Sequence, residues 1–333
     1  MLADIVIPNY NGAAHLDGLF ASLGRQAVRD FRVILVDDAS QDDSVALAER
    51  LARRYGVTLE IVCNSRNRGF AATCNRGIRH AGSHRPAPWV ALLNNDTRPE
   101  PAWLAQLVAT GERDPDVGMV ASKMLFAHRP GMINSAGVAV DWTGIAWDRQ
   151  GGQQDNPAET EVVEVFGPCG GAGLYARPML DEIGGFDEDF FAYLEDVDLA
   201  WRARLAGWRS LYQPQARLLH AHSGTFGEGS PFKSFLLGRN KVWLIAKNYP
   251  QPWLTRHLPA IMAYDGAASL YGLARRRDAA LMRGRLAGLR GLGPMLEKRR
   301  TIQARWRNTD NWVPFMEPME APWRVSRRYE HLG

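Results

Sequence analysis

Four short apolar runs in the first hundred residues alternate with segments of helical character, and this alternation limits the fold more than any other feature. The runs lie within residues 3–8, 31–40, 58–63 and 89–97, and each intervening segment is long enough for one helix. Short apolar runs bounded by turn residues are typical of buried strands. Strands that alternate with helices form a parallel sheet with right-handed crossovers. The sequence therefore predicts an α/β fold.

Polar residues follow these runs, where a parallel sheet gathers the carboxyl ends of its strands. Asn9 and Asn11 follow the first run. Asp37 and Asp38 come directly after the apolar part of the second run, and residues 94–96 come directly after the apolar part of the fourth. Ligands of open α/β sheets bind at this edge. The sequence has neither a P-loop nor G-x-G-x-x-G after its first strand, so a nucleotide would be held by a different arrangement.

The stretch between residues 105 and 177 is harder to interpret. VGMVASKM at 117–124 is typical of a strand, whereas residues 141–157, with several Gly, Gln and Asp, are predicted to be a mobile connection. Residues 162–177 are expected to form two strands around a tight glycine turn. Those glycines would let a ligand approach the backbone.

An acidic segment at the start of a predicted helix is the first candidate for chemistry. Glu195, Asp196 and Asp198 lie there, and apolar residues recur behind them at helical spacing. Carboxylates stabilise helix starts, so a capping cluster is one interpretation. The other is that one of them is a general base, tuned by its acidic neighbours and by the aromatic residues at 190–193.

Cysteine usage and the N-terminus bear on location. The three cysteines are an odd number without metal-ligand spacing, which favours a reducing compartment over a disulfide framework. The N-terminus shows neither a basic segment nor a small-residue cleavage site, so no secretory signal is expected. We therefore predict a cytoplasmic protein, with peripheral contact at the inner face of the cell membrane as an open alternative.

Charge is distributed unevenly along the chain. From residue 235 onward Lys and Arg outnumber Asp and Glu by 18 to 7, although the formal net charge of the whole chain is only +4. In this part, residues 282–300 mix Leu and Met with Arg at about helical spacing. Such a segment could bind an anionic membrane surface, pack as a helical appendage or form a homodimer. No nucleic-acid motif accompanies it, so no nucleic acid is expected as a partner.

Six motifs in a fixed order resemble those of the inverting family 2 glycosyltransferases. The nearest subgroup is bacterial rhamnosyltransferase-like enzymes that build cell-wall or surface polysaccharide. The resemblance covers about residues 3–250, and its specificity comes from the order of the motifs. They are IVIPNYNG near the start, VDDASQDDS at 36–44, NRGFAATCNRG at 67–77, LLNNDT at 92–97, the segment 183–208 and HAHSGTFG at 220–227.

This resemblance implies a GT-A fold, in which helices flank a Rossmann-like, mostly parallel sheet. It implies a glycosyltransferase domain at residues 1–234, with a nucleotide-binding half at 1–100 and an acceptor-binding half at 101–234. Residues 235–333 are predicted to form a basic, helical C-terminal region.

The resemblance also implies a divalent metal that holds the diphosphate of a sugar nucleotide. The family usually has Asp-x-Asp at the end of the fourth strand, whereas this chain has Asn94, Asn95 and Asp96. Asp96 is then the expected carboxylate ligand, and Asn95 is expected beside the donor. His222 is implied as the later ligand, with His220 as the alternative. Imidazole suits Mn²⁺ better than Mg²⁺, although both are plausible.

Further donor contacts come by resemblance from the first strands. Asp38 resembles the carboxylate that hydrogen-bonds a pyrimidine base, although Asp37 cannot be separated from it by sequence. Pro8 and Tyr10 would form part of the pocket for the base. The motif at 67–77 supplies the remaining predicted contacts, Asn67, Arg68 and Asn75, with a solvated Arg68 as the alternative.

Both the resemblance and the chemistry of the residues indicate Asp196 as the catalytic base, with Glu195 as the alternative. An acceptor hydroxyl is a poor nucleophile, so attack on an anomeric carbon needs a base on one side and a metal-stabilised diphosphate leaving on the other. One base and one metal imply a single displacement with inversion.

The sequence thus predicts a metal-dependent hexosyltransferase that moves L-rhamnose from dTDP-L-rhamnose onto a glycan or polyprenyl-linked acceptor. A UDP-sugar donor is the alternative within this class. A non-catalytic sugar-nucleotide or glycan-binding subunit is the alternative outside it, suggested by the single carboxylate in NNDT. A nucleotidyltransferase would need a Gly-rich loop near the first strand, which the sequence lacks.

Overall fold

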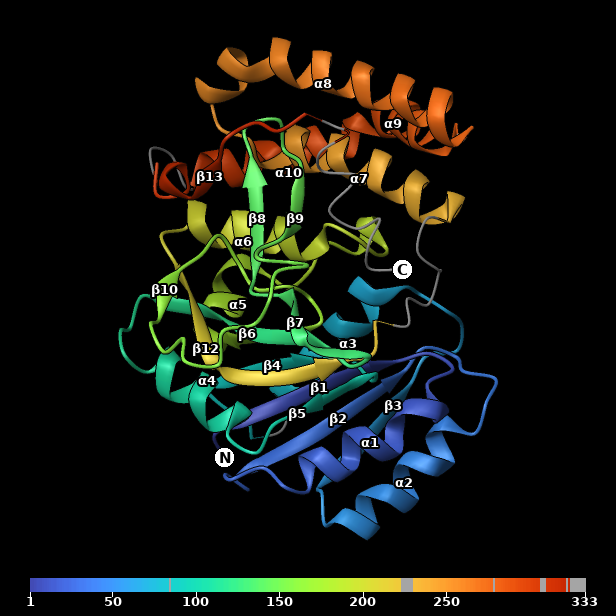
Figure 1. Ribbon diagram of the computed structural model, residues 1–333, viewed down its shortest axis with the longest axis vertical. Helices are drawn as coiled ribbons and strands as arrows, with labels where there is room; N and C mark the ends of the chain where they lie inside the picture. Colours follow the sequence, from blue (N-terminus) through green and yellow to red (C-terminus); the bar gives the residue numbers. More distant parts are fainter. Residues whose placement is uncertain (84, 223–229, 278, 306–309, 322, 324–333) are drawn as a thin grey trace.

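The centre of the molecule is a ten-stranded mixed sheet with the order β10-β12-β6-β11-β4-β1-β2-β3, to which β5 and β7 add at the side (Figure 1). The computed structural model describes residues 1–333 apart from 84, 223–229, 278, 306–309, 322 and 324–333. The predicted α/β fold is confirmed, because the four expected strands form a parallel half-sheet. They are β1 (Ala3–Asn9), β2 (Phe31–Asp37), β3 (Leu59–Cys63) and β4 (Trp89–Leu93).

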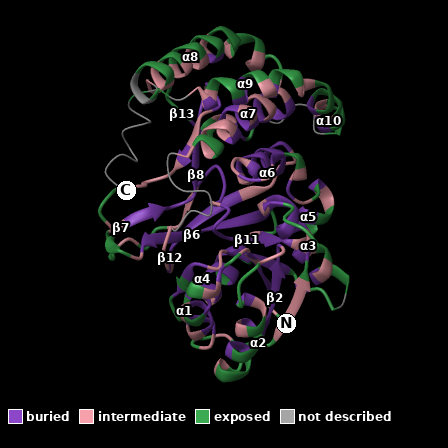
Figure 2. Cartoon of the chain, turned by 90° about the vertical axis from the view of Figure 1, so that its right-hand side faces the viewer, coloured by how far each residue is buried: buried purple, intermediate pink, exposed green. Residues whose placement is uncertain are grey.

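Connectivity decides which face each of the first helices covers. The path from β1 to β2 to β3 runs in one direction, so right-handed crossovers place α1 (Ala13–Leu23) and α2 (Ser44–Tyr55) on the same face. The return to β4 places α3 (Phe70–Ser83) on the other face, as Figure 2 shows. α2 ends at Gly56, whose φ of +63° lies in the left-handed region that glycine adopts without steric cost.

The second half of the sheet is built around β6 (Val117–Phe126), which follows α4 (Trp103–Gly111). β6 pairs in parallel with β12 (Arg209–His220) and antiparallel with β11 (Ala172–Ala176), which in turn pairs with β4. β11 therefore joins the two halves, and the predicted strands at 117–124 and within 162–177 are confirmed. The short strands at the edges are β5 (Thr97–Pro99), β7 (Arg129–Ser135) and β10 (Val163–Glu164).

The predicted mobile connection at 141–157 is wrong for its first residues. β8 (Val138–Asp141) and β9 (Ala146–Asp148) form an antiparallel hairpin, and β13 (Met316–Glu317) adds a third strand. The Asp141 carboxylate accepts hydrogen bonds from two backbone N–H groups inside the turn. Turn residues in sequence look the same in a fixed hairpin and in a mobile loop, and the partner strand β13 lies far away in the chain.

The C-terminal region is helical, as predicted, and α8 lies at the outer end of the molecule (Figure 1). Glycines bring α7 and α9 close together, since a Cβ on Gly238 would lie 2.3 Å from the carbonyl oxygen of Leu281. Among the helices of the described residues, none combines the length and apolarity needed to cross a membrane. The region contains α7 (Pro231–Asn248), α8 (Trp253–Arg276), α9 (Ala280–Arg290), α10 (Leu292–Arg305) and the 3₁₀ turn η2 (Val313–Phe315).

A buried ion network fixes α6 (Glu195–Leu205) against this region. Asp198 is fully buried, and its Oδ2 accepts from Arg202 Nε at 2.9 Å and from Lys247 Nζ at 2.8 Å. Its Oδ1 accepts from Asn248 Nδ2 at 2.7 Å. Burial by itself raises the pKa of Asp198, but Lys247 and Arg202 outweigh that effect and hold the pKa at about 2.

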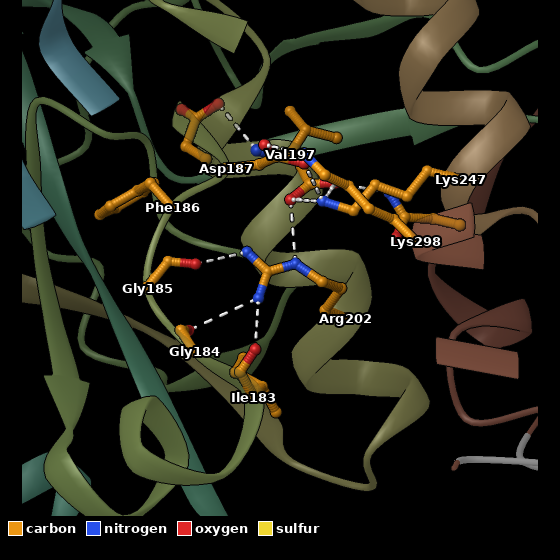
Figure 3. A network of polar contacts seen from close by, with 12 residues as sticks. Ile183, Gly184, Gly185, Phe186, Asp187, Val197, Arg202, Lys247 and Lys298 are labelled. Atoms are coloured by element: carbon orange, nitrogen blue, oxygen red, sulfur yellow. Dashed lines mark hydrogen bonds and ion pairs between the residues drawn. The ribbon is translucent and has the colours of Figure 1, made fainter. Parts of the chain in front are cut away.

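The same network reaches the loop that follows α5 (Arg177–Ile183), as Figure 3 shows. Arg202 donates to the carbonyl oxygens of Ile183 and Gly185 at 2.8 and 2.7 Å. Asp187, at the start of the 3₁₀ turn η1 (Glu188–Phe190), pairs with Lys247 at 2.7 Å and with Lys298 of α10 at 2.6 Å. Three helices and one loop thus share one set of charges.

We expect Asp198→Asn to lower the free energy of unfolding by about 3 kcal/mol, because it leaves Arg202 buried without its counter-charge and Lys247 with Asp187 as its remaining carboxylate partner. A carboxylate whose pKa is depressed on folding contributes stability above its unfolded pKa, and this contribution is lost as the pH falls. Denaturant unfolding should therefore show a large difference at pH 7 that shrinks as the pH is lowered toward about 2.

Glu49→Gln is the matched control, since it removes an exposed carboxylate of α2. It should change the free energy of unfolding by less than about 0.5 kcal/mol. If Asp198→Asn were equally harmless at pH 7, the network would not be what fixes α6.

Candidate active site

A pocket of about 190 Å³ opens at the carboxyl ends of β1, β2 and β4, the edge at which parallel sheets bind ligands. The residues that line it come from the end of β1, the loops after β1 to β4, the start of α3 and the end of β12 with the residues that follow it. Of the residues predicted for the site, those in the lining are Pro8, Tyr10, Asp38, Asn67, Asn95, Asp96 and His222. The rest of the lining consists of Asn9, Gly69, Phe70, Thr73, Asn94 and His220.

Asn9 links the strand ends beneath this pocket, a role that the sequence did not reveal. Its Nδ2 donates to Asp37 Oδ1 at 2.9 Å, and its Oδ1 accepts from Asn95 Nδ2 at 2.8 Å. Gly12 packs directly onto this pair, because a Cβ there would lie 2.2 Å from Asn9 Oδ1 and from Asn95 Nδ2. The PNYNG sequence therefore supplies both a polar bridge and the glycine that leaves room for it.

Asp38 is buried and organises the loop that carries Asn67. Its carboxylate accepts from the backbone N–H groups of Arg68 and Gly69 at 2.9 and 3.0 Å, and from Asn64 Nδ2 at 2.7 Å. Asp37 instead accepts from Asn9 and Ser40. The two aspartates, which the sequence could not separate, thus hold two different loops of the same pocket.

Two predicted donor contacts have other partners and are not part of the pocket lining. The half-exposed Arg68 pairs through its guanidinium with Glu188 at 2.9 Å. Asn75 is buried, donates to the carbonyl of Phe186 at 2.8 Å and accepts from the N–H of Phe186 at 2.8 Å. Both ends of its amide are occupied, so Asn75 fixes the loop before α6 and is not free to contact a donor.

Asp96 lies beside two imidazoles. His220 Nε2 is 3.2 Å from Asp96 Oδ1, and His220 Nδ1 is 2.8 Å from Asn134 Oδ1. The His222 ring packs edge-on against His220 and Phe126, at 5.6 and 5.7 Å between ring centroids. Residues 223–229, which continue the predicted HAHSGTFG motif, lie outside the described part of the chain.

Asp96 and the two histidines could supply only some of the ligands that a cation needs. Within the described ranges, no group of three or more His, Cys, Asp or Glu is arranged to hold a metal ion. One carboxylate with an adjacent imidazole suits a divalent ion whose other positions are filled by phosphate oxygens and water. The chemistry of Asp96 and its histidines is therefore compatible with a metal that binds together with a diphosphate.

Asp196 lies at the start of α6 beside the pocket. Its Oδ2 accepts from the N–H of Gly170 and its Oδ1 from the N–H of Val197, both at 2.8 Å. Gly170 also borders Phe70 of the pocket lining, since its Cβ position lies 3.4 Å from Phe70 Cε1 and from Asp196 Oδ2. Burial raises the pKa of Asp196 to about 6, the two backbone N–H groups limit the rise, and Asp148 adds to it. A carboxylate with this pKa is ionised at pH 7 and still basic enough to accept a proton.

Glu195, the alternative base, has a different environment. It is buried, and its Oε2 has no hydrogen-bond partner among the described residues. Burial, and then the neighbouring Asp196 charge, raise the pKa of Glu195 well above its ordinary value. Two backbone N–H groups orient the Asp196 carboxylate, and Glu195 shows no comparable arrangement at Oε2 among the described residues, so the geometry favours Asp196.

The backbone turn that leads into α6 is strained and held from outside. Phe191, Tyr193 and Leu194 have φ values of +65°, +68° and +67°, a region that costs non-glycine residues energy. Asn240 of α7 is fully buried, and its Nδ2 donates to the carbonyl oxygens of residues 190, 192 and 193 at 3.0, 2.9 and 2.7 Å. Asn240 was missed in the sequence, where its position in α7 gave no sign of contact with the acidic segment.

Solved structures with similar folds identify the fold class. One is the mannosyltransferase PcManGT from Pyrobaculum calidifontis in complex with GDP-Man and Mn²⁺, with a TM-score of 0.54, 19% identity, and coverage of 94% of this chain and 82% of that one. Another is GalNAc-T7 with UDP, GalNAc and Mn²⁺, with a TM-score of 0.61, 17% identity, and coverage of 92% and 58%. The fold is that of the GT-A glycosyltransferases.

Sequence comparison narrows this class to one family. The model named "Glycosyl transferase family 2" matches residues 4–183, so the chain belongs to that family. A curated relative from Mycobacterium tuberculosis, N-acetylglucosaminyl-diphospho-decaprenol L-rhamnosyltransferase, is 29% identical over 84% of this chain and 98% of its own length. The pre-mycofactocin glycosyltransferase of the same organism is 28% identical over 70% of this chain and 46% of its own.

We expect Asn240→Asp to reduce the rate of glycosyl transfer at least tenfold while the affinity for donor nucleotide changes little. The substitution keeps the shape of the side chain but replaces the donor of three hydrogen bonds by an acceptor that repels the three carbonyls. The turn before Asp196 should then relax, whereas the pocket lining does not include this turn. Transfer assays and calorimetric titration of the nucleotide measure the two effects separately.

Asn156→Asp is the matched control, because Asn156 is exposed and its side-chain Oδ1 accepts from the N–H of Ala158, which a carboxylate oxygen can also do. It should leave both quantities unchanged. Equal loss of nucleotide affinity and rate in Asn240→Asp would instead point to a general loss of folding.

Proposed function

We propose that the protein transfers L-rhamnose from dTDP-L-rhamnose to a lipid-linked glycan acceptor, with inversion, in the synthesis of a bacterial cell-wall or surface polysaccharide. The observation that carries this proposal is the place of Asp196 beside the pocket, with a pKa of about 6. The name of the Mycobacterium tuberculosis relative supports the sugar and the class of acceptor. A UDP-sugar donor remains the alternative.

Asp196 acts as the general base in this proposal. Its carboxylate accepts the proton of the acceptor hydroxyl as that oxygen bonds to the anomeric carbon of the donor. The bond between this carbon and the diphosphate oxygen breaks, and the diphosphate leaves with the electron pair. A single displacement of this kind inverts the anomeric configuration. The hydrogen bonds from Gly170 and Val197 keep the carboxylate in one orientation throughout.

The donor would occupy the pocket at the strand ends. We assign Pro8 and Tyr10 to the wall around the base and Asn67 and Asn95 to polar contacts with the donor, because all four line the pocket. Asp38 would act chiefly by holding the loop of Asn67, since its oxygens already accept from that loop. Arg68 and Asn75 are left out of this assignment.

Asp96, with His222 or His220, would hold a divalent cation, Mg²⁺ or Mn²⁺. When bound, that cation neutralises charge on the leaving diphosphate. In a displacement of this kind, Asp196 would act on one side of the anomeric carbon and the cation on the leaving group at the other. A non-catalytic binding subunit would have no use for a carboxylate with the pKa of Asp196.

Location follows the same reasoning. A polyprenyl-linked acceptor resides in a membrane, so we propose a protein that works at the inner face of the cell membrane.

The direct test is release of nucleoside diphosphate from a panel of dTDP- and UDP-sugars by purified protein, with and without Mn²⁺. We expect slow, metal-dependent turnover of dTDP-L-rhamnose and faster turnover with a lipid-linked glycan acceptor. The rate should rise with pH through about 6 and level off above it, because the base works only when deprotonated. Asp196→Asn should lower the transfer rate about 10²- to 10⁴-fold and leave nucleotide affinity nearly unchanged.

Turnover of a UDP-sugar alone would replace the proposed donor while keeping the proposed mechanism. An Asp196→Asn protein with full activity would remove Asp196 as the base. Failure to bind any of these nucleotides would refute the nucleotide-sugar assignment.

The proposed metal site makes a second prediction. Asp96→Asn should abolish the gain in dTDP affinity that Mn²⁺ provides, because it removes the one carboxylate among residues 94–96. Calorimetric titrations with Mn²⁺ and with chelator measure this gain. His222→Ala should reduce it at least about tenfold and His220→Ala by less.

The reverse order of the two histidine variants would assign the imidazole ligand to His220. Binding of dTDP that is equally strong with Mn²⁺ and with chelator in the wild type would remove the metal from the proposal.

A further inference from the structure

The outward face of α8 is apolar along most of the helix. Between residues 258 and 274 every exposed residue is nonpolar, which corresponds to a stripe about 24 Å long. Met262 and Leu270 are 66% and 69% exposed, the highest values among the exposed large hydrophobic residues of the described chain. The exposed residues of this stripe are Leu258, Pro259, Met262, Ala263, Gly266, Ala267, Leu270, Leu273 and Ala274.

Buried charges on the opposite face fix this orientation. Asp265 is the one acidic residue of α8, and it pairs with Lys241 of α7 and with Arg285 of α9. The backbone carbonyl of Asp265 also accepts from Arg285, at 2.7 Å. The helix is thus anchored through its polar side, and its apolar stripe is turned away from the molecule (Figure 2).

Exposed cations accompany the stripe. Arg256 is exposed near the start of α8, and Arg283 and Arg290 are exposed on α9, which lies beside it (Figure 1). α9 contains no acidic residue, and it exposes Met282, Leu286 and Leu289 beside these arginines. Aliphatic side chains mixed with arginines form a surface of the kind that binds at a bilayer interface.

We propose that α8 and α9 form a docking face for an anionic lipid bilayer, with the α8 stripe inserted among the acyl chains and the arginines at the headgroups. A second copy of this chain is a poorer occupant, because a twofold contact would place the same exposed arginines opposite one another. Negative headgroups complement them instead. This proposal goes beyond the proposed function and stands on the two helices alone.

Flotation with lipid vesicles tests the docking face. The whole chain should float with vesicles of phosphatidylcholine and phosphatidylglycerol, more weakly at high salt, and should stay behind with phosphatidylcholine alone. Met262→Gln/Leu270→Gln and Arg283→Gln/Arg290→Gln should each reduce the partition coefficient roughly tenfold or more. Arg50→Gln/Arg53→Gln is the matched control, since it removes two exposed arginines from α2, and it should float like the wild type.

Two results would overturn the proposal. One is equal flotation of the wild type and both helix variants, or equal flotation with neutral vesicles. The other is light scattering that shows a dimer which the α8 variant converts to a monomer, because a second copy would then cover the stripe. Release of nucleotide in the absence of acceptor should be the same in all these variants, so failure of the docking face can be told apart from failure of the proposed activity.

Discussion

The buried carboxylate of Asp198 is the constraint on which the catalytic end of this molecule depends. A fully buried charge is tolerated only when opposite charges and hydrogen-bond donors surround it, and here two of those partners, Lys247 and Asn248, come from α7. The start of α6 can therefore occupy its position only when α7 is packed against it. Asn240 of the same helix holds the strained turn that precedes Asp196. The C-terminal region is thus part of the site and not an appendage to it.

Three carboxylates within one helical turn illustrate how surroundings decide chemical role. Burial without a counter-charge raises the pKa of Glu195 well above its ordinary value, whereas Lys247 and Arg202 hold that of Asp198 at about 2. Asp196 lies between these extremes, because two backbone N–H groups limit the rise that burial causes. With this pKa, Asp196 is ionised at pH 7 and still appreciably basic. The three acids are neighbours in the sequence, and the fold gives each of them a different environment and a different pKa.

Local patterns in the sequence predicted much of the fold and some residues of the candidate site. The four parallel strands and the polar residues after them were predictable, because apolar runs and turn residues are properties of neighbouring positions. The contacts of Asn75, Arg68 and Asn240 depend on segments that are distant in the chain. For Asn75 and Arg68 the partner lies more than 100 residues away, whereas for Asn240 it is nearer. The β8–β9 hairpin was not predicted for the same reason, because its partner strand β13 is distant in the chain. The type of a residue indicates which groups it can bind, but the packing of the folded chain decides which partner it contacts.

Asn94 and the base are connected through the glycine turn at 170–171. Asn94 Nδ2 lies 3.3 Å from the Cβ position of Gly171, and the adjacent Gly170 donates its N–H to Asp196. A carboxylate at position 94, as the family motif usually has, would bring a second negative charge toward Asp196. A like charge at short range raises the pKa of a carboxyl group. With burial and Asp148 already holding Asp196 at about 6, such a charge would keep a larger share of it protonated at neutral pH. In the proposed mechanism, the neutral amide of Asn94 would therefore give one fewer anionic ligand to the cation and avoid a further rise in the pKa of Asp196.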